Sequence, residues 1–436
     1  MSASNTVDNQ PGTENRTKVK QLKVAGIAAQ YQKDWFKSTQ KKLAAGEPFC
    51  LANADAPHEI FLAMDDIPVV MTQWWSAIIS AKQLSTYYFD KMNEAGYQRN
   101  LCRYCSLPLA CAMDHNPERA PWGGLPNPTI LLSQLSCDIQ VKVFERMARE
   151  YNCKFFSMEY PAPVPNYPRW WERLETGWEE VIGATALDLR VEELKALIRY
   201  LETTTGRVFN YKHFMKIMEL ENQQEEYLKK IRDLLAVTRP SPVGLPDQLA
   251  ATMNLQWHRG TQWGLDHTRL FYEEVREKID KGEAVCKNEK IRLMWIGRGL
   301  WHNTGFYRYF EEKYGAVFTN SMYLSIAGDG YIRKYQSDPL RALASRHLYM
   351  GYCLRDPEWQ LNEGKRFGVH GAVMIVASNC IDSVGNMFIK MVLEEAGIPV
   401  LPIYADIVDA REWDDEGIKT AVSQFIEKRC LPKIGQ

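Results

Sequence analysis

The chain has 436 residues, of which 45% are apolar, and its 53 Lys and Arg residues almost balance its 54 Asp and Glu residues. This length predicts two or three domains with real hydrophobic cores, and the net charge of -1 argues against nucleic acid or a membrane surface as a partner. No stretch has the apolar core of a secretion signal or the roughly 18 apolar residues of a membrane span, so we expect a soluble cytoplasmic protein.

The first part of the chain is expected to be a tail followed by helices. Residues 1–20 are polar, which predicts a disordered tail. Residues 21–95 predict an N-terminal helical region, because segments such as VKQLKVAGIAAQYQKDWFKSTQKKL have apolar residues at helical spacing. Within this region, PHEIFLAMDD followed by IPVVMTQWW predicts a helix that leads into a short buried strand.

Beyond this region, strands and helices alternate. We expect a first α/β domain with a helical extension over residues 96–284 and a second α/β domain over residues 285–436. The first includes PTILLSQLSCD and KFFSMEYP as strands and two long charged helices from residue 189 to 240. The second includes KIRLMWIGRGL, HGAVMIVASNC and IPVLPIYADIVD as strands. The alternation predicts an α/β fold of two parallel-sheet, flavodoxin-like domains with helical insertions.

An internal repeat points to two cysteines. TILLSQLSC and AVMIVASNC each end an apolar strand with a cysteine, Cys137 and Cys380, and each precedes a helix and another strand. In parallel sheets, ligands bind beyond the carboxyl ends of the strands. A helix N-terminus at that place lowers the pKa of a thiol and stabilises an anionic cluster. The repeat therefore predicts an iron-sulfur site between the two domains.

A third group of cysteines lies in LCRYCSLPLACAM, where Cys102, Cys105 and Cys111 occur within ten residues. The C-x-x-C pair is also found in zinc sites and in thioredoxin-like redox sites. No second close Cys or His pair supports zinc, and Pro108 with the polar loop after it argues against a pair that opens a helix. Ligand type and spacing favour a cluster.

Other motifs carry less information. In a reducing compartment disulfides are not expected, and five cysteines without a spacing partner are expected to be packed or half-exposed thiols: Cys50, Cys153, Cys286, Cys353 and Cys430. The loop GRGLWHNTG around Gly297 and Gly299 lacks the G-x-G-x-x-G spacing, and no Walker motif is present, so we do not expect a P-loop ATP site.

The stretches RNLCRYCSLPLA, PTILLSQLSCD, GAVMIVASNC and AGIPVLPIYADIVDAR resemble the 2-hydroxyacyl-CoA dehydratase and benzoyl-CoA reductase family, from about residue 55 to the C-terminus. Within it, IPVVMTQWWSA and LCRYC resemble the B subunit of the ATP-dependent benzoyl-CoA reductases. The resemblance implies a 4Fe-4S cluster held by Cys102, Cys137 and Cys380, with Cys105 as a further metal ligand or a neighbour.

The resemblance also implies partners and a reaction. The expected partners are a paralogous cluster subunit, ATPase (activator) subunits with their own 4Fe-4S cluster, ferredoxin, and a CoA-thioester substrate. The implied enzyme is an oxidoreductase that acts on CH-CH groups, with ferredoxin as donor. It reduces the ring of benzoyl-CoA by two electrons to a cyclohexadiene carbonyl-CoA, in anaerobic degradation of aromatic compounds.

Two other functions stay open at this point. One is a 2-hydroxyacyl-CoA dehydratase that uses ketyl radical chemistry, and the other is a zinc-stabilised scaffold without chemistry of its own. Some relatives provide a carboxylate ligand where this chain has Thr72 and Gln73. The proton donor is not marked by any motif, and Glu159, Asp406 and Asp409 are polar candidates at strand ends.

Overall fold

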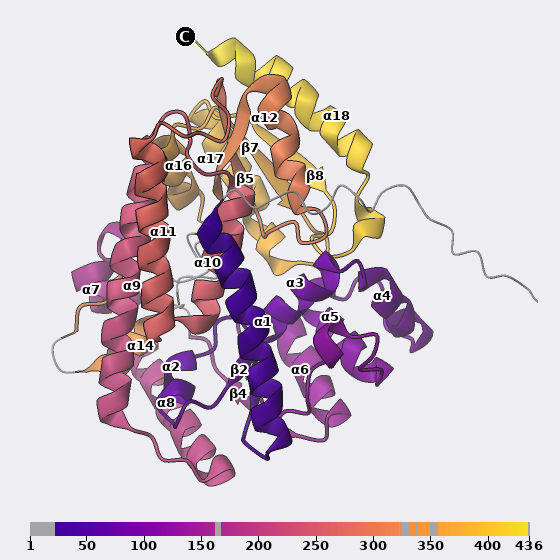
Figure 1. The fold of residues 1–436 in the computed structure, drawn as a ribbon, viewed down its shortest axis with the longest axis vertical. Coiled ribbons are helices and arrows are strands. Elements are labelled where there is room, and N and C mark those ends of the chain that lie inside the picture. Colours follow the sequence, from indigo (N-terminus) through magenta and orange to yellow (C-terminus); the bar gives the residue numbers. More distant parts are fainter. Residues whose placement is uncertain are drawn as a thin grey trace, which may run out of the picture.

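Two four-stranded parallel sheets form the centre of the molecule (Figure 1). The computed structural model describes residues 22–161, 167–321, 323–324, 331–335, 338–346, 348 and 356–434. The strands of the first sheet are β1 (Cys50–Ala52), β2 (Val69–Met71), β3 (Ile130–Gln134) and β4 (Lys154–Met158). Those of the second are β5 (Ile291–Ile296), β6 (Ala316–Ser321), β7 (Gly371–Val376) and β8 (Val400–Tyr404).

The two sheets share one strand order. It is β2-β1-β3-β4 in the first sheet and β6-β5-β7-β8 in the second, and every pair of neighbours is parallel. In each sheet the first strand along the chain therefore lies beside the third, as in flavodoxin-like folds. The predicted fold class, with two parallel-sheet domains, is confirmed.

Helices cover the sheets (Figure 1). On the first half of the chain they are α1 (Lys23–Ala44), α2 (His58–Leu62), α3 (Thr72–Ala81), α4 (Ser85–Glu94), α5 (Arg103–Asp114), α6 (Asp138–Glu150), α7 (Leu174–Ile182) and α8 (Ala184–Thr205). On the second half they are α9 (Tyr211–Val237), α10 (Leu245–His258), α11 (Gln262–Asp280), α12 (Tyr309–Tyr314), α14 (Pro339–Ser345), α16 (Pro357–Phe367), α17 (Asn386–Glu395) and α18 (Asp415–Phe425). Short 3-10 or π segments are η1 (Pro121–Gly123), η2 (Trp170–Glu172), η3 (Thr304–Arg308), η4 (Ile381–Gly385), η5 (Ala410–Glu412), η6 (Ile426–Cys430) and η7 (Leu431–Lys433).

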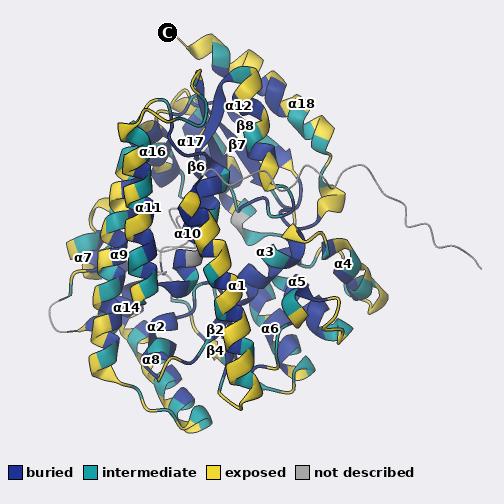
Figure 2. Cartoon of the chain, viewed as in Figure 1, coloured by how far each residue is buried: buried dark blue, intermediate teal, exposed yellow. Residues whose placement is uncertain are grey.

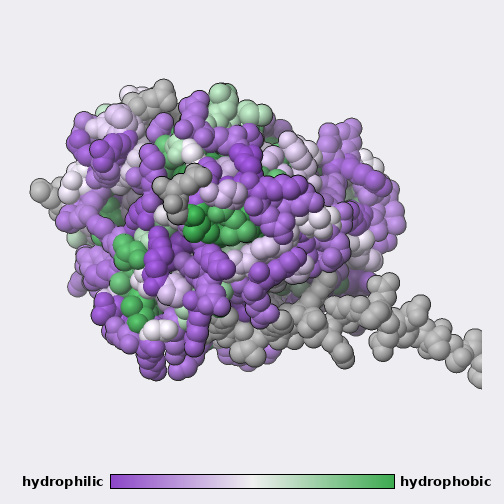
Figure 3. Space-filling view, turned by 90° about the horizontal axis from the view of Figure 1, so that it is seen from above, coloured by the Kyte–Doolittle hydropathy of each residue, from purple (hydrophilic) through white to green (hydrophobic). Residues whose placement is uncertain are grey.

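The burial pattern follows from this layering (Figure 2). Strands β3 and β5 are buried along their whole length, because helices cover both faces of a parallel sheet. Strands β4 and β8, at the ends of the sheets, are partly exposed. The face seen in Figure 3 is mostly hydrophilic, with a few apolar patches. Among the described residues, no helix is both long enough and apolar enough to cross a membrane.

The segment 21–95 contains two strands as well as helices. The predicted passage from a helix into a short strand is confirmed by α2 and β2. β1 was not predicted, since three residues carry too little periodicity. Both strands pair into the sheet that contains β3, so this sheet begins before residue 96. The domain boundaries themselves stay a prediction, and the expected tail, residues 1–20, lies outside the described residues.

An aromatic stack fastens α1 to the end of α10 and the start of α11. The rings of Tyr31 and Trp263 stack with centroids 3.7 Å apart, and His267 stacks on Trp263 at 4.8 Å. His258 contacts Tyr31 edge-on, and its Nε2 lies 2.7 Å from Oε1 of Gln32. Burial and the neighbouring His267 lower the pKa of His258 to about 3, and burial lowers the pKa of His267 to about 4. Both imidazoles are therefore neutral in the folded chain at neutral pH.

These histidines should make the fold less stable as the pH falls. Below the ordinary histidine pKa of about 6.5, the two imidazoles bind protons in the unfolded chain but stay neutral in the folded chain. Lowering the pH therefore favours unfolding. As the pH falls from 6 to 5, we expect His258 and His267 each to lower the free energy of unfolding by about 1 kcal/mol. Urea denaturation should show that His258→Gln removes this share of the slope. The surface variant His115→Gln is the control, and equal slopes in all three proteins would contradict the assignment.

Candidate functional site

Three predicted site residues each stand directly before a helical segment. Cys102 precedes α5, Cys137 precedes α6, and Cys380 precedes η4, which runs into α17. Cys137 follows β3 and Cys380 follows β7, and each of these is the third strand of its sheet. The equivalent placement that the sequence repeat predicted is confirmed. The backbone N-H groups at these helix starts have no partner within the helix and carry partial positive charge, which favours thiolates.

The cysteines of the two sheets meet. The buried thiol of Cys102 hydrogen-bonds with the thiols of Cys105 and Cys380. The pKa of Cys102 is raised well above its ordinary value, first by the contact with Cys105 and also by burial. The contact with Cys380 lowers the pKa but does not outweigh these two effects. Cys137 lies close enough to Cys380 for the two charges to interact. The structure thus brings together four cysteines from three separate segments.

Backbone N-H groups also point at these thiols. Burial raises the pKa of Cys137, while the N-H groups of Gln140 and Ile139, in the first turn of α6, donate to its sulfur and lower the pKa. The N-H of Cys105 does the same for Cys102. Donors of this kind stabilise negative charge on sulfur whether the sulfur belongs to a free thiolate or to a bound group.

The donor set can be compared with what a metal site needs. Among the described residues, no three His, Cys, Asp or Glu side chains form a group that could hold a metal ion. This finding bears equally on a structural zinc ion, which needs four ligands around one point, and on a cluster. Cysteine sulfurs on separate segments, with N-H groups directed at them, are the donors that iron-sulfur clusters use. The residues therefore suit a cluster in kind, and the ligand assignment stays a prediction.

The start of α5 corrects one expectation. We expected Pro108 to keep the C-x-x-C pair out of a helix, and this is wrong: Cys102 caps α5 and the helix runs through Pro108. Proline has no N-H to donate to the carbonyl four residues earlier, which is that of Tyr104. The hydroxyl of Ser76, on α3, donates to this carbonyl at 2.7 Å instead. A distant serine thus replaces the hydrogen bond that proline cannot make.

Arg103 links the start of α5 to the second sheet. Its guanidinium lies 3.7 Å from Asp406, 3.2 Å from Asp409 and 2.5 Å from Glu412, all beyond the carboxyl end of β8. The side chains of Arg103, Asp406 and Asp409 are 9%, 2% and 1% exposed. Because buried charges are costly unless paired, these ion pairs hold the two segments at a fixed separation.

Asp406 extends this link to the loop that carries Cys380. Its carboxylate accepts hydrogen bonds from the N-H groups of Val408 and Asp409 and, at 3.1 Å, from the amide of Asn379. Burial raises the pKa of Asp406, although these donors and Arg103 oppose the shift. For Asp409, burial acts upward but hydrogen bonds from Arg411 and the charge of Arg103 outweigh it, so its pKa is lowered. Of the two, Asp406 is the one held nearer to a neutral, proton-carrying state.

The remaining candidates lie in less informative places. Glu159 is exposed at the end of β4, where its N-H donates to Glu193 and its carbonyl accepts from Arg190. Thr72 and Gln73 are buried at the start of α3, where the Oε1 of Gln73 accepts hydrogen bonds from the N-H of Ala54 and from Thr72. These two side chains tie α3 to the end of β1.

The cysteines expected to be packed or half-exposed are so where the structure describes them. Cys50 and Cys430 are buried, and Cys153 and Cys286 are half-buried. Burial raises the pKa of Cys153 to about 11 and that of Cys430 to about 12. Cys353 lies outside the described residues.

Sequence reasoning missed a polar cluster beside Cys102. The hydroxyls of Tyr104 and Tyr323 are 3.5 Å apart, and the guanidinium of Arg298 lies over both rings, 5.6 and 5.9 Å from their centroids. Nothing in the spacing of these residues marks them. The one available signal was position, since Tyr104 follows Cys102 closely and Arg298 follows a buried strand.

The glycine-rich loop after β5 has a packing role. Gly297 has φ +112°, and a Cβ there would collide with the side chain of Ile375 on β7. The loop is held by a hydrogen bond from the indole of Trp295 to the carbonyl of Arg298, 2.7 Å long. Glycine is required here for close approach of the two strands, which explains the motif without a phosphate ligand.

Comparisons with known proteins agree on one family. A family model described as "2-hydroxyglutaryl-CoA dehydratase, D-component" matches residues 53–428. The (R)-2-hydroxyisocaproyl-CoA dehydratase alpha subunit of Clostridioides difficile is 20% identical over 389 residues, 88% of this chain and 90% of that protein. The B subunit of benzoyl-CoA reductase from Thauera aromatica is 24% identical over 357 residues, 77% of this chain and 78% of that protein.

The buried ion pairs of Arg103 should matter more than ion pairs at the surface. Arg103→Gln leaves Asp406 and Asp409 buried without their counter-charge, and we expect it to lower the free energy of unfolding by about 3 kcal/mol. The control is Arg169→Gln, which removes an ion pair with Glu172 between side chains 72% and 44% exposed. This variant should lower the free energy of unfolding by less than about 1 kcal/mol. Denaturant unfolding of both variants is the measurement, and similar losses would mean that Arg103 is no such link.

Proposed function

Because this chain belongs to the 2-hydroxyglutaryl-CoA dehydratase D-component family, we propose that it is an iron-sulfur subunit of an enzyme that acts on CoA thioesters. In this proposal Cys102, Cys137 and Cys380 bind a 4Fe-4S cluster. The observation that supports it most is the contact between Cys102 and Cys380, thiols on two segments far apart in the sequence. Packing alone does not require cysteine at both places.

The chain's own residues would bind the cluster, orient it and shield it. When bound, a cluster of this type supplies single electrons at low potential. The three thiolates hold it, and the N-H groups at the starts of α5 and α6 stabilise its negative charge. Arg103 and Asp406 fix the distance between the segments that carry Cys102 and Cys380. Cys105 is either the fourth ligand or a neighbour that covers the site.

The reaction we propose first is reduction of an aromatic ring. Benzoyl-CoA takes up two electrons, from reduced ferredoxin, and two protons, and becomes a cyclohexadiene carbonyl-CoA, with ATP hydrolysed on separate subunits. The thioester carbonyl accepts the incoming electron, and hydrogen-bond donors aimed at that oxygen lower the barrier. Similarity to the B subunit of benzoyl-CoA reductase and the stretches LCRYC and IPVVMTQWW support this choice.

Dehydration of a 2-hydroxyacyl-CoA is the second candidate. The relative that covers more of the chain is a dehydratase subunit, and the family model carries a dehydratase description. Here the electron enters the thioester, water leaves from the hydroxyacyl group, and the electron is returned at the end of each turnover. Both reactions place the same demand on the cysteine site, so the site does not choose between them.

The proposal includes partner subunits. Both relatives are named as subunits, and we propose a paralogous cluster subunit together with an ATPase that has its own 4Fe-4S cluster. An apolar stripe supports a protein partner near the site. It begins four residues after Cys380 and consists of side chains that are 51% to 69% exposed: Val384, Met387, Phe388 and Met391. Exposed apolar surface of this kind marks protein contacts.

Removal of a ligand cysteine should remove iron. We expect Cys102→Ala, Cys137→Ala and Cys380→Ala each to lose or convert the cluster, because a thiolate bond is lost and the site opens to water and oxygen. Cys286→Ala, in a half-buried thiol whose sulfur lies 3.2 Å from the carbonyl of Glu311, is the control and should keep its iron. Iron content and electron paramagnetic resonance of anaerobically purified protein are the readouts.

The outcome for the single variants separates the roles. Full iron in both the Cys137 and Cys380 variants would refute a cluster between the two sheets. A colourless protein that contains zinc would refute the cluster altogether. Cys105→Ala distinguishes a fourth ligand, whose loss changes the spectrum, from a neighbour, whose loss does not.

Counting ATP distinguishes the two reactions. A reductase, assembled with its partner subunits, should consume ATP and reductant in proportion to the benzoyl-CoA that disappears. A dehydratase needs both only to start, because the electron returns after each turnover. The measurement is anaerobic turnover of benzoyl-CoA and of a 2-hydroxyacyl-CoA, with ATP and reductant counted per product. Water loss from the hydroxyacyl substrate with sub-stoichiometric ATP, and an untouched aryl ring, would select the dehydratase.

A further inference from the structure

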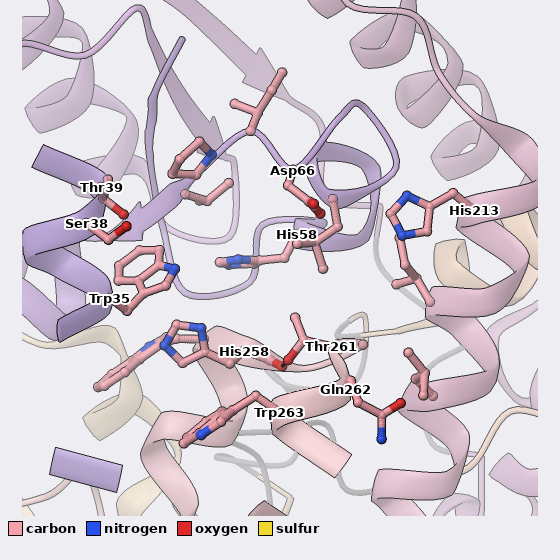
Figure 4. A pocket seen from close by; sticks show the side chains of 18 of the residues that line it. Trp35, Ser38, Thr39, His58, Asp66, His213, His258, Thr261, Gln262 and Trp263 are labelled. Carbon is pink, nitrogen blue, oxygen red and sulfur yellow. Dashed lines mark hydrogen bonds between the residues drawn. The ribbon is translucent and has the colours of Figure 1, made fainter. Parts of the chain in front are cut away.

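A cavity of about 470 Å³ lies apart from the cysteines, between α1, the α2–β2 segment, the start of α9 and the α10–α11 turn. None of its described lining residues is a cysteine or belongs to the link around Arg103. Figure 4 shows Trp35, His58 and His258 among the side chains around it, from different elements of the fold. Its volume lies in the range of small-molecule sites.

One wall of the cavity is a rigid aromatic surface. The ring of Trp35 lies 4.9 Å from that of His258, which is fixed by Gln32. Trp263 is held flat against Tyr31. The turn between His258 and Trp263 passes through Gly260, at φ +71°, where a Cβ would press on Ile217 of α9. The rings are therefore held in place before any ligand arrives, which favours binding of a flat apolar group.

Two buried polar atoms in the lining lack a partner. Within the described part of the chain, neither Nε2 of His58 nor Nε1 of Trp257 makes a hydrogen bond. The side chain of His58 is 4% exposed, and burial, with Arg259 and His258 nearby, keeps its pKa well below the ordinary value. Buried polar atoms in native proteins are almost always paired. Both atoms are closed off from solvent, so they lie behind the surface of the cavity rather than on it.

Two lysines lie in the exposed part of the lining. Lys42 at the end of α1 and Lys216 on α9 are exposed lining residues, and no ion pair to either occurs among the described residues. Asp66 is the one acidic side chain in the described lining. The balance favours an anionic group at the opening, with the aromatic wall further inside.

We propose that this cavity binds a planar aromatic ring that carries a negatively charged group. The ring lies against Trp35, and the anion lies between Lys42 and Lys216. Two sources share this chemistry: the adenosine phosphate part of a CoA thioester, and a free aromatic carboxylate. The proposal does not depend on the cysteine site, because none of the residues involved is shared.

Calorimetric titration of the full chain tests the proposal. The probes are adenosine 3′,5′-bisphosphate, benzoate, and uncharged adenosine as the control ligand. We expect one of the two anions to bind and adenosine to bind at least tenfold more weakly. Binding of the bisphosphate identifies the CoA tail, and binding of benzoate alone identifies an aromatic acid.

Variants locate the binding. Lys216→Gln and Trp35→Leu should each weaken the anion at least tenfold, whereas Lys212→Gln, on the same helix but outside the lining, should not. Lys216 is exposed, so its variant is expected to fold even if a change at Trp35 disturbs α1. No binding of either anion, equal binding of adenosine, or unchanged affinity in Lys216→Gln would overturn the proposal. Iron content should stay at the native level in all variants, which separates this result from failure of the cysteine site.

Discussion

The buried charges around Arg103 are the interaction on which the cysteine site depends. A guanidinium and two carboxylates out of water are costly, and the cost is offset only when almost every polar atom has a partner. Asp406 meets this condition through two backbone N-H groups and Asn379. The geometry is therefore narrowly set, because a shift of α5 relative to the loop before Cys380 breaks several of these contacts at once. Convergence of the thiols is a consequence of this charge pairing as much as of the fold.

The fold explains why the site lies where two sheets meet. In each sheet the third strand lies beside the first, so the strand order reverses between them. The loops after β3 and β7 leave the carboxyl ends of the sheets at this switch point, which is where parallel sheets bind ligands. Side chains there are not needed for the core, and helix starts supply unpaired N-H groups. The cavity beside α1 follows another principle, since it is built mostly from helices and a turn, with the sheet contributing Val69 at the start of β2 and the segment before it. The cysteine site and the cavity are thus built from separate parts of the fold.

The parts of the fold and of the cysteine site that depend on neighbouring residues could be predicted from the sequence. The strands that end at Cys137 and Cys380 were predicted because apolar runs followed by helical periodicity need only neighbouring residues. The course of α5 was not, because Pro108 is tolerated only through Ser76, which lies on another helix. The role of Arg103 depends on carboxylates about 300 residues further along the chain. No sequence pattern connects positions that far apart. The polar atoms of the cavity also escaped, since a single buried His or Trp leaves no periodic pattern.

The contact between Cys102 and Cys380 also sets an order of events during synthesis. Cys102 and Cys137 leave the ribosome at least 243 residues before Cys380 (380 − 137), which at about 5–20 residues per second is a delay of roughly 12–50 s. During this time the first sheet can form with its thiols uncovered and without the segment that carries Asn379 and Asp406. If these cysteines bind the proposed cluster, the nascent chain must keep Cys102 and Cys137 reduced and unoccupied by other metal ions until its last third has been made. Chaperones or a low oxygen level at the site of translation would serve that requirement, and a truncated product would expose reactive thiols with no means of closing over them.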